Sequence, residues 1–438
     1  MGLKVCVIGA ARSGYATARL ALDEGYHVIL TDERVLDDKD EIVKKGAIVY
    51  DGGFNKDLIH MNFDWVVKNP GVPQHHPFVI EMAKNNFIAN EMEFAQRFVA
   101  KWKLGAITGT NGKTTTTSML GEILSRFTSF GFVAGNIGIP LSVVVDENRN
   151  RQHGYGAIEV AAFQLINTKN FHPHVATIVS LAPDHLDVFK SENEYYDAKW
   201  RIVDNLTSDD YFILNIDDPI ILKTKKNTIA KVITISIKSE ADVCIKDGFV
   251  MYQKHVLFEP KKLNVVGDHN ITNAMIAGIM AYCMGVKPKL IQKSLHQFMG
   301  VPHRIEYVDT INGVKYFNDS KGTNPQSTRV AIEAFEQPII LLAGGYDKKL
   351  SFDDLKSMDS LLKHIIVFGQ TKDILKETFP RAIVVDNLEE ALYKAKELAI
   401  KGDIVCLSPA CASYDQYKNY EIRGEHFKNI VAMLKQSD

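Results

Sequence analysis

The sequence predicts an α/β protein made of three successive segments with parallel sheets. Apolar strands alternate with helical stretches along most of the 438 residues, and this alternation is typical of parallel sheets. A glycine turn follows the first strand at residues 9–14, and a second glycine loop follows a buried strand at residues 109–114. Because the chain is too long for one hydrophobic core, we expect several domains.

Composition and charge exclude several classes of protein. Hydrophobic residues make up 46% and charged residues 24%, which is an ordinary soluble composition. The formal net charge of −2 argues against a general nucleic-acid-binding protein, which usually carries a basic excess. No apolar run reaches the roughly 20 residues of a membrane helix, so we expect no membrane insertion, and the N-terminus lacks a signal peptide. The five cysteines have no C-x-x-C spacing, which favours a reducing cytoplasm over a disulfide or zinc framework.

The first segment, residues 1–92, begins with a strand, a turn, a helix and a second strand that ends at Asp32. Further strands are predicted at 47–50 and within 64–73. The turn at 9–14 has Ala11 where a dinucleotide-binding turn has its middle glycine, which weakens an NAD site. An anionic ligand at the helix N-terminus and a simple tight turn remain equally good interpretations.

The second segment, residues 93–298, contains the loop "GTNGKTTTT" at 109–117. A strict Walker loop has a glycine at position 107, where this chain has Ile107. The chemistry is unchanged, because backbone amides from Gly109 to Lys113 can surround phosphate oxygens. Lys113 can reach the β and γ phosphates, and the Thr114 hydroxyl can ligate Mg²⁺. We therefore predict that the loop binds a nucleoside triphosphate.

A phosphate loop also needs a carboxylate for the metal, and Glu159 follows a small apolar strand that suits this role. Asp184, His185 and Asp187 lie in a loop after another strand. A helix is predicted at 191–206, opened by a capping box of Ser191 and Glu194. A third α/β segment, residues 299–438, repeats the strand–helix alternation.

Nine motifs resemble, in order, those of the Mur ligases. They cover nearly the whole chain and read "GTNGKTTTT", "AGNIGIPL", "EVAAFQL", "APDHLD", "YDAKWRI", "GDHNITNA", "VPHRIEYV", "NDSKGTNPQST" and "LSPACASYDQYKNYEIRG". The last two are the most specific, and they resemble the branch of the family that adds D-glutamate. The resemblance implies three domains: Rossmann-like at the N-terminus, a P-loop ATPase type in the centre and Rossmann-like at the C-terminus.

The resemblance also implies a reaction and its partners. ATP would activate the carboxylate of UDP-N-acetylmuramoyl-L-alanine as an acyl phosphate, D-glutamate would attack it, and phosphate would leave a tetrahedral intermediate. The implied cofactor is Mg²⁺, at two sites, held by Thr114, Glu159, His185 and Lys199. The implied catalytic residues are Lys113, Glu159, His185, Lys199 and Lys321.

Substrate-binding residues follow from the same matches. The ATP site would comprise Gly109, Thr110, Asn111, Gly112, Lys113, Thr114, Thr115, Asn270, Asn273, Arg304 and Asp319. The UDP-substrate site would comprise Arg12, Ser13, Asp32, Arg34, Gly71, Asn136 and His185. D-glutamate would be bound by Thr323, Lys348, Ser413, Tyr414 and Tyr420, with Lys349 an equally good chemical alternative to Lys348.

Lys199 matches a lysine that the family carbamylates, which turns a cation into an anion able to support Mg²⁺. From the sequence alone, an exposed helical lysine is the simpler interpretation. Cys411 lies in the last motif and, with no histidine near it in sequence, is interpreted as a structural thiol.

The chain departs from the family pattern at three places. Ala161 and Ala162 replace two serines, one of which touches the muramoyl substrate in the family. Val188-Phe189 replaces Arg-His, and "SLA" at 180–182 replaces Asn-Ile-Thr. All matched phosphate and metal positions are kept, so we expect the chain to be active, with altered binding of the substrate.

Three alternatives stay open at this point. A sister ligase or folylpolyglutamate synthase would share most of the motifs. A regulatory ATP-binding protein would share only the phosphate loop. A dehydrogenase is suggested by the first glycine turn alone.

Overall fold

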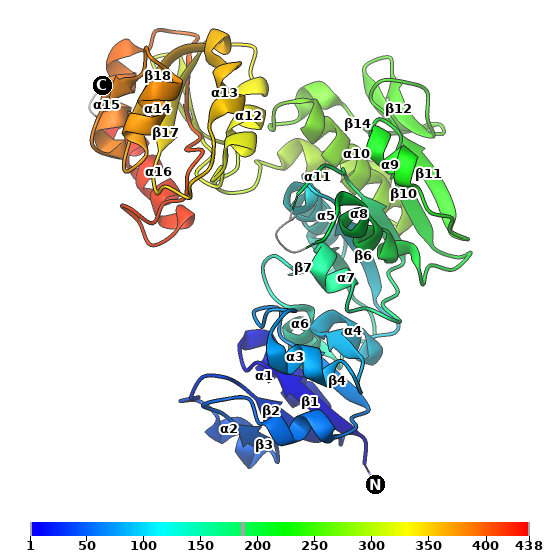
Figure 1. The fold of residues 1–438 in the computed structure, drawn as a ribbon. Helices are drawn as coiled ribbons and strands as arrows, with labels where there is room; N and C mark the ends of the chain where they lie inside the picture. Colours follow the sequence, from blue (N-terminus) through cyan, green and yellow to red (C-terminus); the bar gives the residue numbers. More distant parts are fainter. Residues whose placement is uncertain (1, 185–188, 437–438) are drawn as a thin grey trace. The chain divides into compact units, whose positions relative to one another are not determined.

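Three sheets organise the computed structural model, which describes residues 2–184 and 189–436 (Figure 1). The chain forms two compact units, Met1–Pro260 with Thr272–Leu295, and Lys261–Ile271 with His296–Asp438. The first unit contains two sheets and the second contains one. The predicted α/β class is confirmed, and the division at 1–92, 93–298 and 299–438 stays a prediction.

The first sheet is parallel throughout, with the strand order β3-β2-β1-β4-β5. Val5–Ile8 in β1 is completely buried, because a parallel sheet is covered on both faces and its central strands read as continuous apolar runs. Its strands are β1 (Lys4–Ile8), β2 (His27–Thr31), β3 (Ile48–Tyr50), β4 (Trp65–Lys68) and β5 (Ile88–Asn90). Its helical elements are α1 (Arg12–Asp23), α2 (Asp40–Lys44), η1 (Lys56–His60), α3 (Pro77–Met82), α4 (Glu91–Ala95) and η2 (Gln96–Phe98).

The second sheet has nine strands in the order β14-β13-β12-β11-β10-β9-β6-β8-β7. β6 lies between β8 and β9, with Ile107 opposite both Glu159 and Thr177. The carboxyl ends of these parallel strands therefore meet where the phosphate loop begins. The strands are β6 (Lys103–Thr108), β7 (Gly131–Gly135), β8 (Tyr155–Glu159), β9 (Val175–Ile178), β10 (Tyr211–Asn215), β11 (Lys231–Ile235), β12 (Val243–Lys246), β13 (Phe249–Tyr252) and β14 (His255–Phe258).

Helices between residues 113 and 297 follow these strands. They are α5 (Lys113–Phe127), α6 (Leu141–Asn148), α7 (Ala162–Leu165), α8 (Glu192–Trp200), η3 (Arg201–Val203), α9 (Pro219–Thr224), η4 (Pro260–Lys262), α10 (Asp268–Cys283) and α11 (Pro288–Gln297). α6 packs against α1 and α4, and thereby joins the first two sheets. The Glu91 carboxylate accepts a 2.6 Å hydrogen bond from the Ser142 amide, and Arg19 pairs with Asp146 at 2.7 Å.

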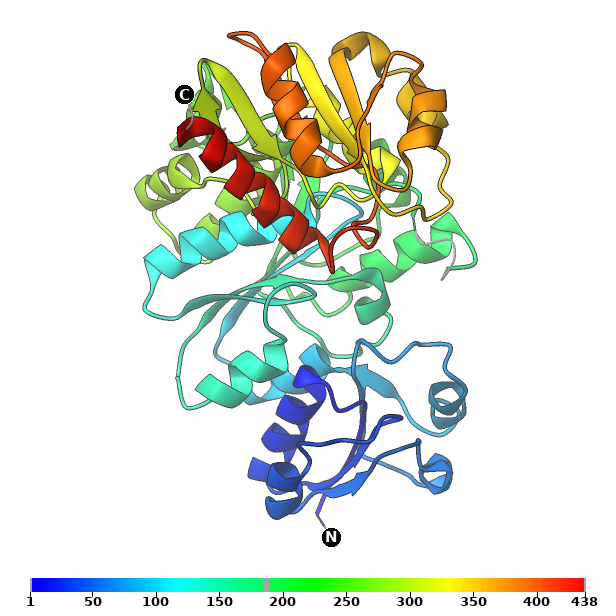
Figure 2. The ribbon, with the colours of Figure 1, turned by 90° about the vertical axis from the view of Figure 1, so that its left-hand side faces the viewer.

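The third sheet has the order β15-β16-β20-β17-β18-β19. Figure 2 shows the long C-terminal helix, α16, lying along this sheet, where it packs on β15 and β16. The strands are β15 (Glu306–Ile311), β16 (Val314–Asn318), β17 (Ile339–Gly344), β18 (Leu362–Phe368), β19 (Ile383–Val384) and β20 (Ile404–Leu407). The helical elements are α12 (Pro325–Glu333), α13 (Asp353–Lys356), η5 (Asp359–Leu361), α14 (Lys372–Thr378), α15 (Leu388–Leu398) and α16 (Tyr420–Gln436).

Two local predictions need correction. The predicted helix 191–206 is α-helical only over Glu192–Trp200. Ser191 does cap it by accepting from the Glu194 amide at 3.2 Å, but the Glu194 carboxylate accepts from the Lys190 amide instead of returning to Ser191. The capping box is therefore only half formed.

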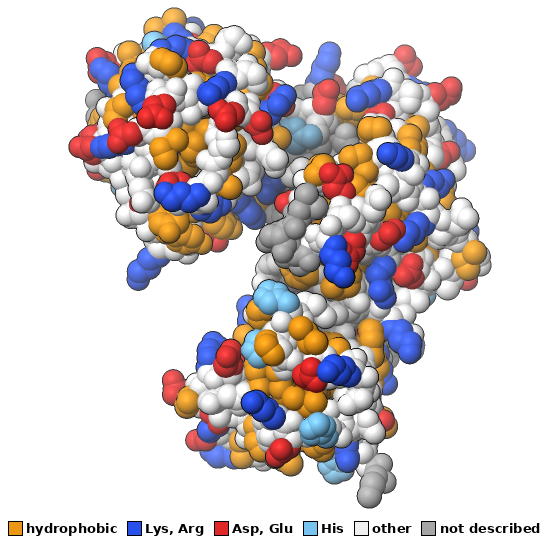
Figure 3. Space-filling view, viewed as in Figure 1, with side chains coloured by type: hydrophobic (Ala, Val, Ile, Leu, Met, Phe, Trp, Pro, Cys, Tyr) orange, Lys and Arg blue, Asp and Glu red, His pale blue; other side chains and the backbone are white. Residues whose placement is uncertain are grey.

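No helix among the residues that the structure describes combines the length and apolarity needed to cross a membrane. Figure 3 shows basic and acidic side chains interspersed over the visible surface, which agrees with the small net charge.

Candidate active site

The phosphate loop connects β6 to α5 through two glycines with positive φ, 146° at Gly109 and 81° at Gly112. A Cβ on Gly112 would lie 2.6 Å from both the Asn273 side chain and Val179, so only glycine fits this tightly packed turn. Lys113 Nζ donates to the carbonyl oxygens of Gly109 at 2.9 Å and Thr110 at 2.8 Å. The lysine is therefore folded back over its own loop.

Residues 180–182, which depart from the family pattern, hold this loop in place. The Thr110 amide donates to the Ser180 carbonyl at 2.7 Å, and the Asn111 amide donates to Ser180 Oγ at 3.0 Å. Thr110 Oγ1 donates to the Ala182 carbonyl at 3.1 Å. Ser180 thus has a specific structural role that sequence reasoning did not assign. Thr114 is half-buried and Thr115 is buried.

Glu159 ends β8, is 1% exposed and lies beside Asn136. Asn136 Nδ2 donates to Glu159 Oε1 at 2.9 Å. Glu159 Oε2 is buried and has no hydrogen-bond partner among the described residues. Because an unpaired buried carboxylate oxygen is unfavourable, this atom fits a cation ligand.

Lys199, at the end of α8, is 1% exposed, so the interpretation as an exposed helical lysine is wrong. Its Nζ donates to the Gly109 carbonyl at 2.7 Å and lies 4.4 Å from the centre of the Tyr195 ring. Burial lowers the pKa of Lys199 to about 6, with help from the nearby charge of Lys113 and opposition from Asp184 and Glu159. The amine is therefore largely neutral at pH 7.

His185 and Asp187 lie outside the described residues. Within the described ranges, no group of three His, Cys, Asp or Glu side chains is arranged to hold a metal ion. Of the proposed cation ligands, Thr114, Glu159 and Lys199 are on or beside the phosphate loop, so the donors present there fit a cation bound together with phosphate oxygens.

The two predicted asparagines of α10 have different partners. Asn273 Oδ1 accepts from Thr116 Oγ1 of α5 at 3.1 Å, which links α10 to the phosphate-loop helix. Asn270 Nδ2 donates to the Val266 carbonyl at 2.7 Å.

Five of the predicted UDP-substrate residues lie at the carboxyl edge of the first sheet: Arg12, Ser13, Asp32, Arg34 and Gly71. Asn136 instead follows β7 of the second sheet. Asn69 joins Ser13 to Gly71. Its Nδ2 donates to Ser13 Oγ at 2.6 Å, and its Oδ1 accepts from the Gly71 amide at 2.8 Å. Asn69 was missed in the sequence, where only its position after a buried strand marks it. Its neighbour Lys68 is also buried and donates to the carbonyls of Asn69 at 3.2 Å and Val72 at 2.6 Å.

Asp32 is 5% exposed and organises the first glycine turn. Its Oδ2 accepts from the Ala10 amide at 2.6 Å, and its Oδ1 accepts from the Arg34 amide at 2.8 Å. The Arg34 guanidinium also contacts this carboxylate, at 3.2 Å, while Arg12 is exposed. The Asp32 carboxylate therefore already has hydrogen-bond and ion-pair partners within the chain.

In the second unit, Asp319 directly follows β16 and is 4% exposed. Burial raises its pKa to about 7, against the lowering effects of its hydrogen bond from Ser408 and the nearby Arg304. Ser408 Oγ donates to Asp319 Oδ2 at 2.7 Å, and the Ile305 amide donates to Oδ1 at 3.2 Å. Arg304 Nε is buried without a hydrogen-bond partner in the described chain.

The predicted D-glutamate residues differ in exposure. The predicted catalytic Lys321 lies close to one of them, with its Nζ 5.7 Å from the Tyr420 ring centre. Ser413 is buried, Tyr414 is 67% exposed and Thr323 is half-buried. Lys349 pairs with Asp347 at 2.7 Å, whereas Lys348 is exposed and makes no ion pair with the described residues. This difference favours Lys348 over Lys349.

Arg423, another residue missed in the sequence, connects two of the matched motifs from α16. It is 1% exposed and donates to the carbonyls of Ser320, Cys411 and Ala412 at 2.8, 3.1 and 3.2 Å. Cys411 is buried, and burial raises its pKa to about 11. A thiol of this kind is unreactive, in agreement with the prediction of a structural cysteine.

Two family models match the chain: the Mur ligase middle domain over residues 107–281, and the Mur ligase glutamate ligase domain over residues 303–411. A relative from Thermoanaerobacter pseudethanolicus is 40% identical, and the match covers 99% of both chains. The chain belongs to the Mur ligase family. The matched ranges contain the phosphate loop, Glu159, Lys199 and Asp319 of the site described above.

This relative is named UDP-N-acetylmuramoylalanine–D-glutamate ligase. A relative from Streptococcus pneumoniae with the same name is 35% identical over 99% of this chain and 98% of its own. Among solved structures, the UDP-N-acetylmuramate–alanine ligase MurC from Thermotoga maritima is similar in fold, with a TM-score of 0.58, 17% identity and full coverage of both chains. MurF from Acinetobacter baumannii has a TM-score of 0.59 and 19% identity over 86% of this chain and 91% of its own.

Proposed function

We propose that this Mur ligase uses ATP to join D-glutamate to the L-alanyl carboxylate of UDP-N-acetylmuramoyl-L-alanine. The observation that carries the proposal is the full-length similarity, at 35–40% identity, to relatives named for this reaction. The phosphate loop with the buried Glu159 and Lys199 beside it supplies the matching chemistry. Because the reaction consumes ATP and a nucleotide-linked sugar, we place it in the cytoplasm, in the synthesis of peptidoglycan precursors.

The proposed reaction has two steps. A carboxylate oxygen of the UDP-substrate attacks the γ phosphorus of ATP, so that ADP leaves and an acyl phosphate forms. The D-glutamate nitrogen then attacks the acyl carbon, and the tetrahedral intermediate expels phosphate and loses a proton to form the amide. Both steps concentrate negative charge, which oriented amides and cationic side chains stabilise.

The residues of the chain have distinct proposed roles. The amides of residues 109–113 and the Lys113 ammonium would bind the ATP phosphates, with the Lys113 contacts to Gly109 and Thr110 exchanged for phosphate oxygens. Mg²⁺, when bound at two sites, would neutralise phosphate charge, and Thr114, Glu159, His185 and Lys199 would hold it. Thr115, Asn270, Asn273, Arg304 and Asp319 complete the proposed ATP site.

We infer that Lys199 carries a carbamate in the active enzyme. Its nitrogen is buried against the loop, and a largely neutral amine is the form that attacks CO₂. The nitrogen lone pair forms the new N–C bond and a proton leaves to solvent, so that a cationic side chain becomes an anion able to hold Mg²⁺. A ¹³C-bicarbonate NMR signal that is lost in Lys199→Ala tests this inference.

The remaining proposed contacts divide between the two other substrates. The UDP-substrate would be bound by Arg12, Ser13, Asp32, Arg34, Gly71, Asn136 and His185. D-glutamate would be bound by Thr323, Lys348, Ser413, Tyr414 and Tyr420, with Lys321 stabilising the tetrahedral intermediate. The first and third sheets would then belong to two Rossmann-like domains. In the sequence, one precedes and the other follows a central P-loop domain.

Phosphate release and product mass test the proposed function together. We expect phosphate release from ATP to require both D-glutamate and UDP-N-acetylmuramoyl-L-alanine, with a product heavier than the UDP-substrate by one glutamyl residue. Release of phosphate without either substrate would contradict ligation and would indicate a regulatory ATPase.

A further inference from the structure

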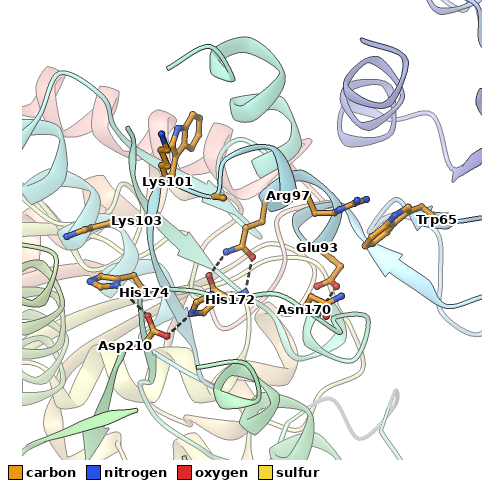
Figure 4. Close-up of a pocket in the computed structure, with 12 residues that line it drawn as sticks. Trp65, Glu93, Arg97, Lys101, Lys103, Asn170, His172, His174 and Asp210 are labelled. Atoms are coloured by element: carbon orange, nitrogen blue, oxygen red, sulfur yellow. Dashed lines mark hydrogen bonds and ion pairs between the residues drawn. The ribbon is translucent and has the colours of Figure 1, made fainter. Parts of the chain in front are cut away.

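A pocket of about 590 Å³ lies at the amino-terminal edge of the central sheet, where β6, β9 and β10 begin (Figure 4). The phosphate loop leaves β6 at its other end, so the pocket lies on the opposite edge of the sheet. Its walls come from β4, from the linker α4–η2 and from the residues that precede β6, β9 and β10. The lining residues are Trp65, Glu93, Gln96, Arg97, Ala100, Lys101, Trp102, Lys103, Asn170, His172, His174 and Asp210.

Three cations line this pocket, and none has an ion-pair partner within the described ranges: Arg97, Lys101 and Lys103. The Arg97 guanidinium carbon lies 4.5 Å from the centre of the Trp65 ring. Figure 4 shows these two side chains side by side at one end of the pocket. Stacking of this kind restricts the guanidinium and leaves its N–H edge available to an acceptor.

The two acidic groups of the pocket are buried and each is hydrogen-bonded within the chain, although Glu93 Oε2 has no hydrogen-bond partner among the described residues. Asp210 Oδ2 accepts from His172 Nε2 at 2.6 Å and from both the amide and the hydroxyl of Thr207 at 2.7 Å. Glu93 Oε1 accepts from the Asn170 amide at 2.7 Å, and burial raises the Glu93 pKa. Two acids that are buried and hydrogen-bonded in this way offset the three cations only in part.

We propose that this pocket binds a small organic or inorganic anion with two or more phosphate or carboxylate groups, at a site separate from the ligase site. Arg97 can bind such a group through two parallel hydrogen bonds, and the two lysines supply point charges. The volume lies within the usual range for small-molecule sites. The proposal does not depend on the ligase reaction.

An occupant would contact both the linker and the central sheet. The linker is held to the segment before β9, because the His172 amide donates to Gln96 Oε1 at 2.9 Å and the Gln96 amide group donates to the His172 carbonyl. A ligand that adds contacts across these two segments stabilises the folded state by mass action. We therefore expect the bound anion to raise the melting temperature.

Pyrophosphate and citrate serve as the two probes, and each is titrated into the full chain at constant ionic strength. A non-hydrolysable ATP analogue is present throughout, so that the phosphate loop is occupied. Two of the three tryptophans, Trp65 and Trp102, line the pocket, so intrinsic fluorescence reports on it directly. The pocket variant is Lys101→Gln/Lys103→Gln, and the matched control is Lys223→Gln/Lys225→Gln, which removes two exposed lysines at the end of α9. Arg97→Gln provides a second pocket variant.

We expect a saturable fluorescence change and a raised melting temperature in the wild type and in the control. In the pocket variants, the dissociation constant should rise at least about tenfold, because hydrogen bonds to charged groups are lost. Tighter binding of pyrophosphate would identify a phosphate ligand, and tighter binding of citrate a carboxylate ligand. The proposal would be overturned if the fluorescence of the wild type showed no saturable change, or if the wild type and all variants bound the probes with equal affinity.

Discussion

The Lys199 amine donates a 2.7 Å hydrogen bond to the carbonyl oxygen of Gly109, the first residue of the phosphate loop. The two residues are 90 positions apart in the sequence, yet the contact is completely buried. It places a side chain of α8 beside the loop where ATP phosphates and a cation would bind. Burial lowers the pKa of the same lysine to about 6, so its amine is largely neutral at pH 7, which is the form that the proposed carbamylation requires.

Replacement of Lys199 should abolish most of the ligase activity. We expect Lys199→Ala to lower kcat by about 100-fold, the upper range for loss of a group that supports a metal ligand. Lys190→Ala, at an exposed lysine before the same helix, should keep wild-type activity. Steady-state phosphate release measures both variants, and a Lys199→Ala enzyme with wild-type kcat would contradict this role.

Asn69 should control affinity for the UDP-substrate. It bridges Ser13 and Gly71, so Asn69→Ala removes one buried and one partly buried hydrogen bond between proposed substrate contacts. Loss of about 1–1.5 kcal/mol of binding corresponds to a KM for the UDP-substrate that rises about five- to twelvefold, while the KM for D-glutamate stays unchanged. Asn85→Ala, which loses only an exposed contact to the Ile59 carbonyl, is the matched control. Equal changes in both KM values would indicate a general structural effect.

Lys68 should make stability depend on pH in the alkaline range. Burial lowers its pKa from 10.5 to about 8, whereas the unfolded chain keeps the proton up to about pH 10. The unfolded state therefore binds more protons between these values, and the stability of the wild type rises with pH. Relative to Lys68→Met, the wild type should gain about 1–2 kcal/mol between pH 7.5 and 9.5.

Urea unfolding of the wild type and Lys68→Met at the two pH values measures this gain. Lys84→Met is the control, because Lys84 is exposed and pairs only with Glu81 on the surface. A difference between wild type and Lys68→Met that does not change with pH would contradict the assignment of a buried, depressed pKa.

Restoring a serine at position 161 should improve both the fold and substrate binding. Ala161 is the N-cap of α7 and its amide already donates to Gln164 Oε1 at 2.9 Å. A serine hydroxyl there can accept from an amide of the first turn, which typically adds about 0.5–1 kcal/mol of stability. We expect Ala161→Ser to raise the melting temperature and lower the KM for the UDP-substrate. Ala162→Ser, one residue inside the helix, should give no capping stabilisation, and an unchanged KM in Ala161→Ser would mean that the site has compensated elsewhere.

The sequence predicted the parallel strands well because they are continuous apolar runs bounded by glycine turns. β6, β8 and β9 all lie where the pattern indicates. The antiparallel hairpins β12–β13 and β15–β16 were missed. Their signals were the Asp247-Gly248 and Asn312-Gly313 turns, whose four residues all have positive φ, as tight hairpins require.

The site was predicted less completely than the fold, because buried polar contacts join residues distant in the sequence. Lys199 looked exposed in the sequence since α8 is rich in polar residues, and only its tertiary contact with Gly109 reveals its burial. Asn69 and Arg423 act through hydrogen bonds to other loops, which no local pattern records. Ser180 shows the reverse case, since a departure from the family pattern carries its own contact with the phosphate loop.

An amino-acid panel in the phosphate-release assay tests the central claim most directly. ATP, Mg²⁺ and UDP-N-acetylmuramoyl-L-alanine are kept constant, and D-glutamate, L-glutamate, L-alanine, a diamino acid and a dipeptide are supplied in turn. We predict that D-glutamate alone supports rapid phosphate release, with one amide product formed for each phosphate. Rapid release with another amino acid and none with D-glutamate would contradict the account and would identify a sister ligase.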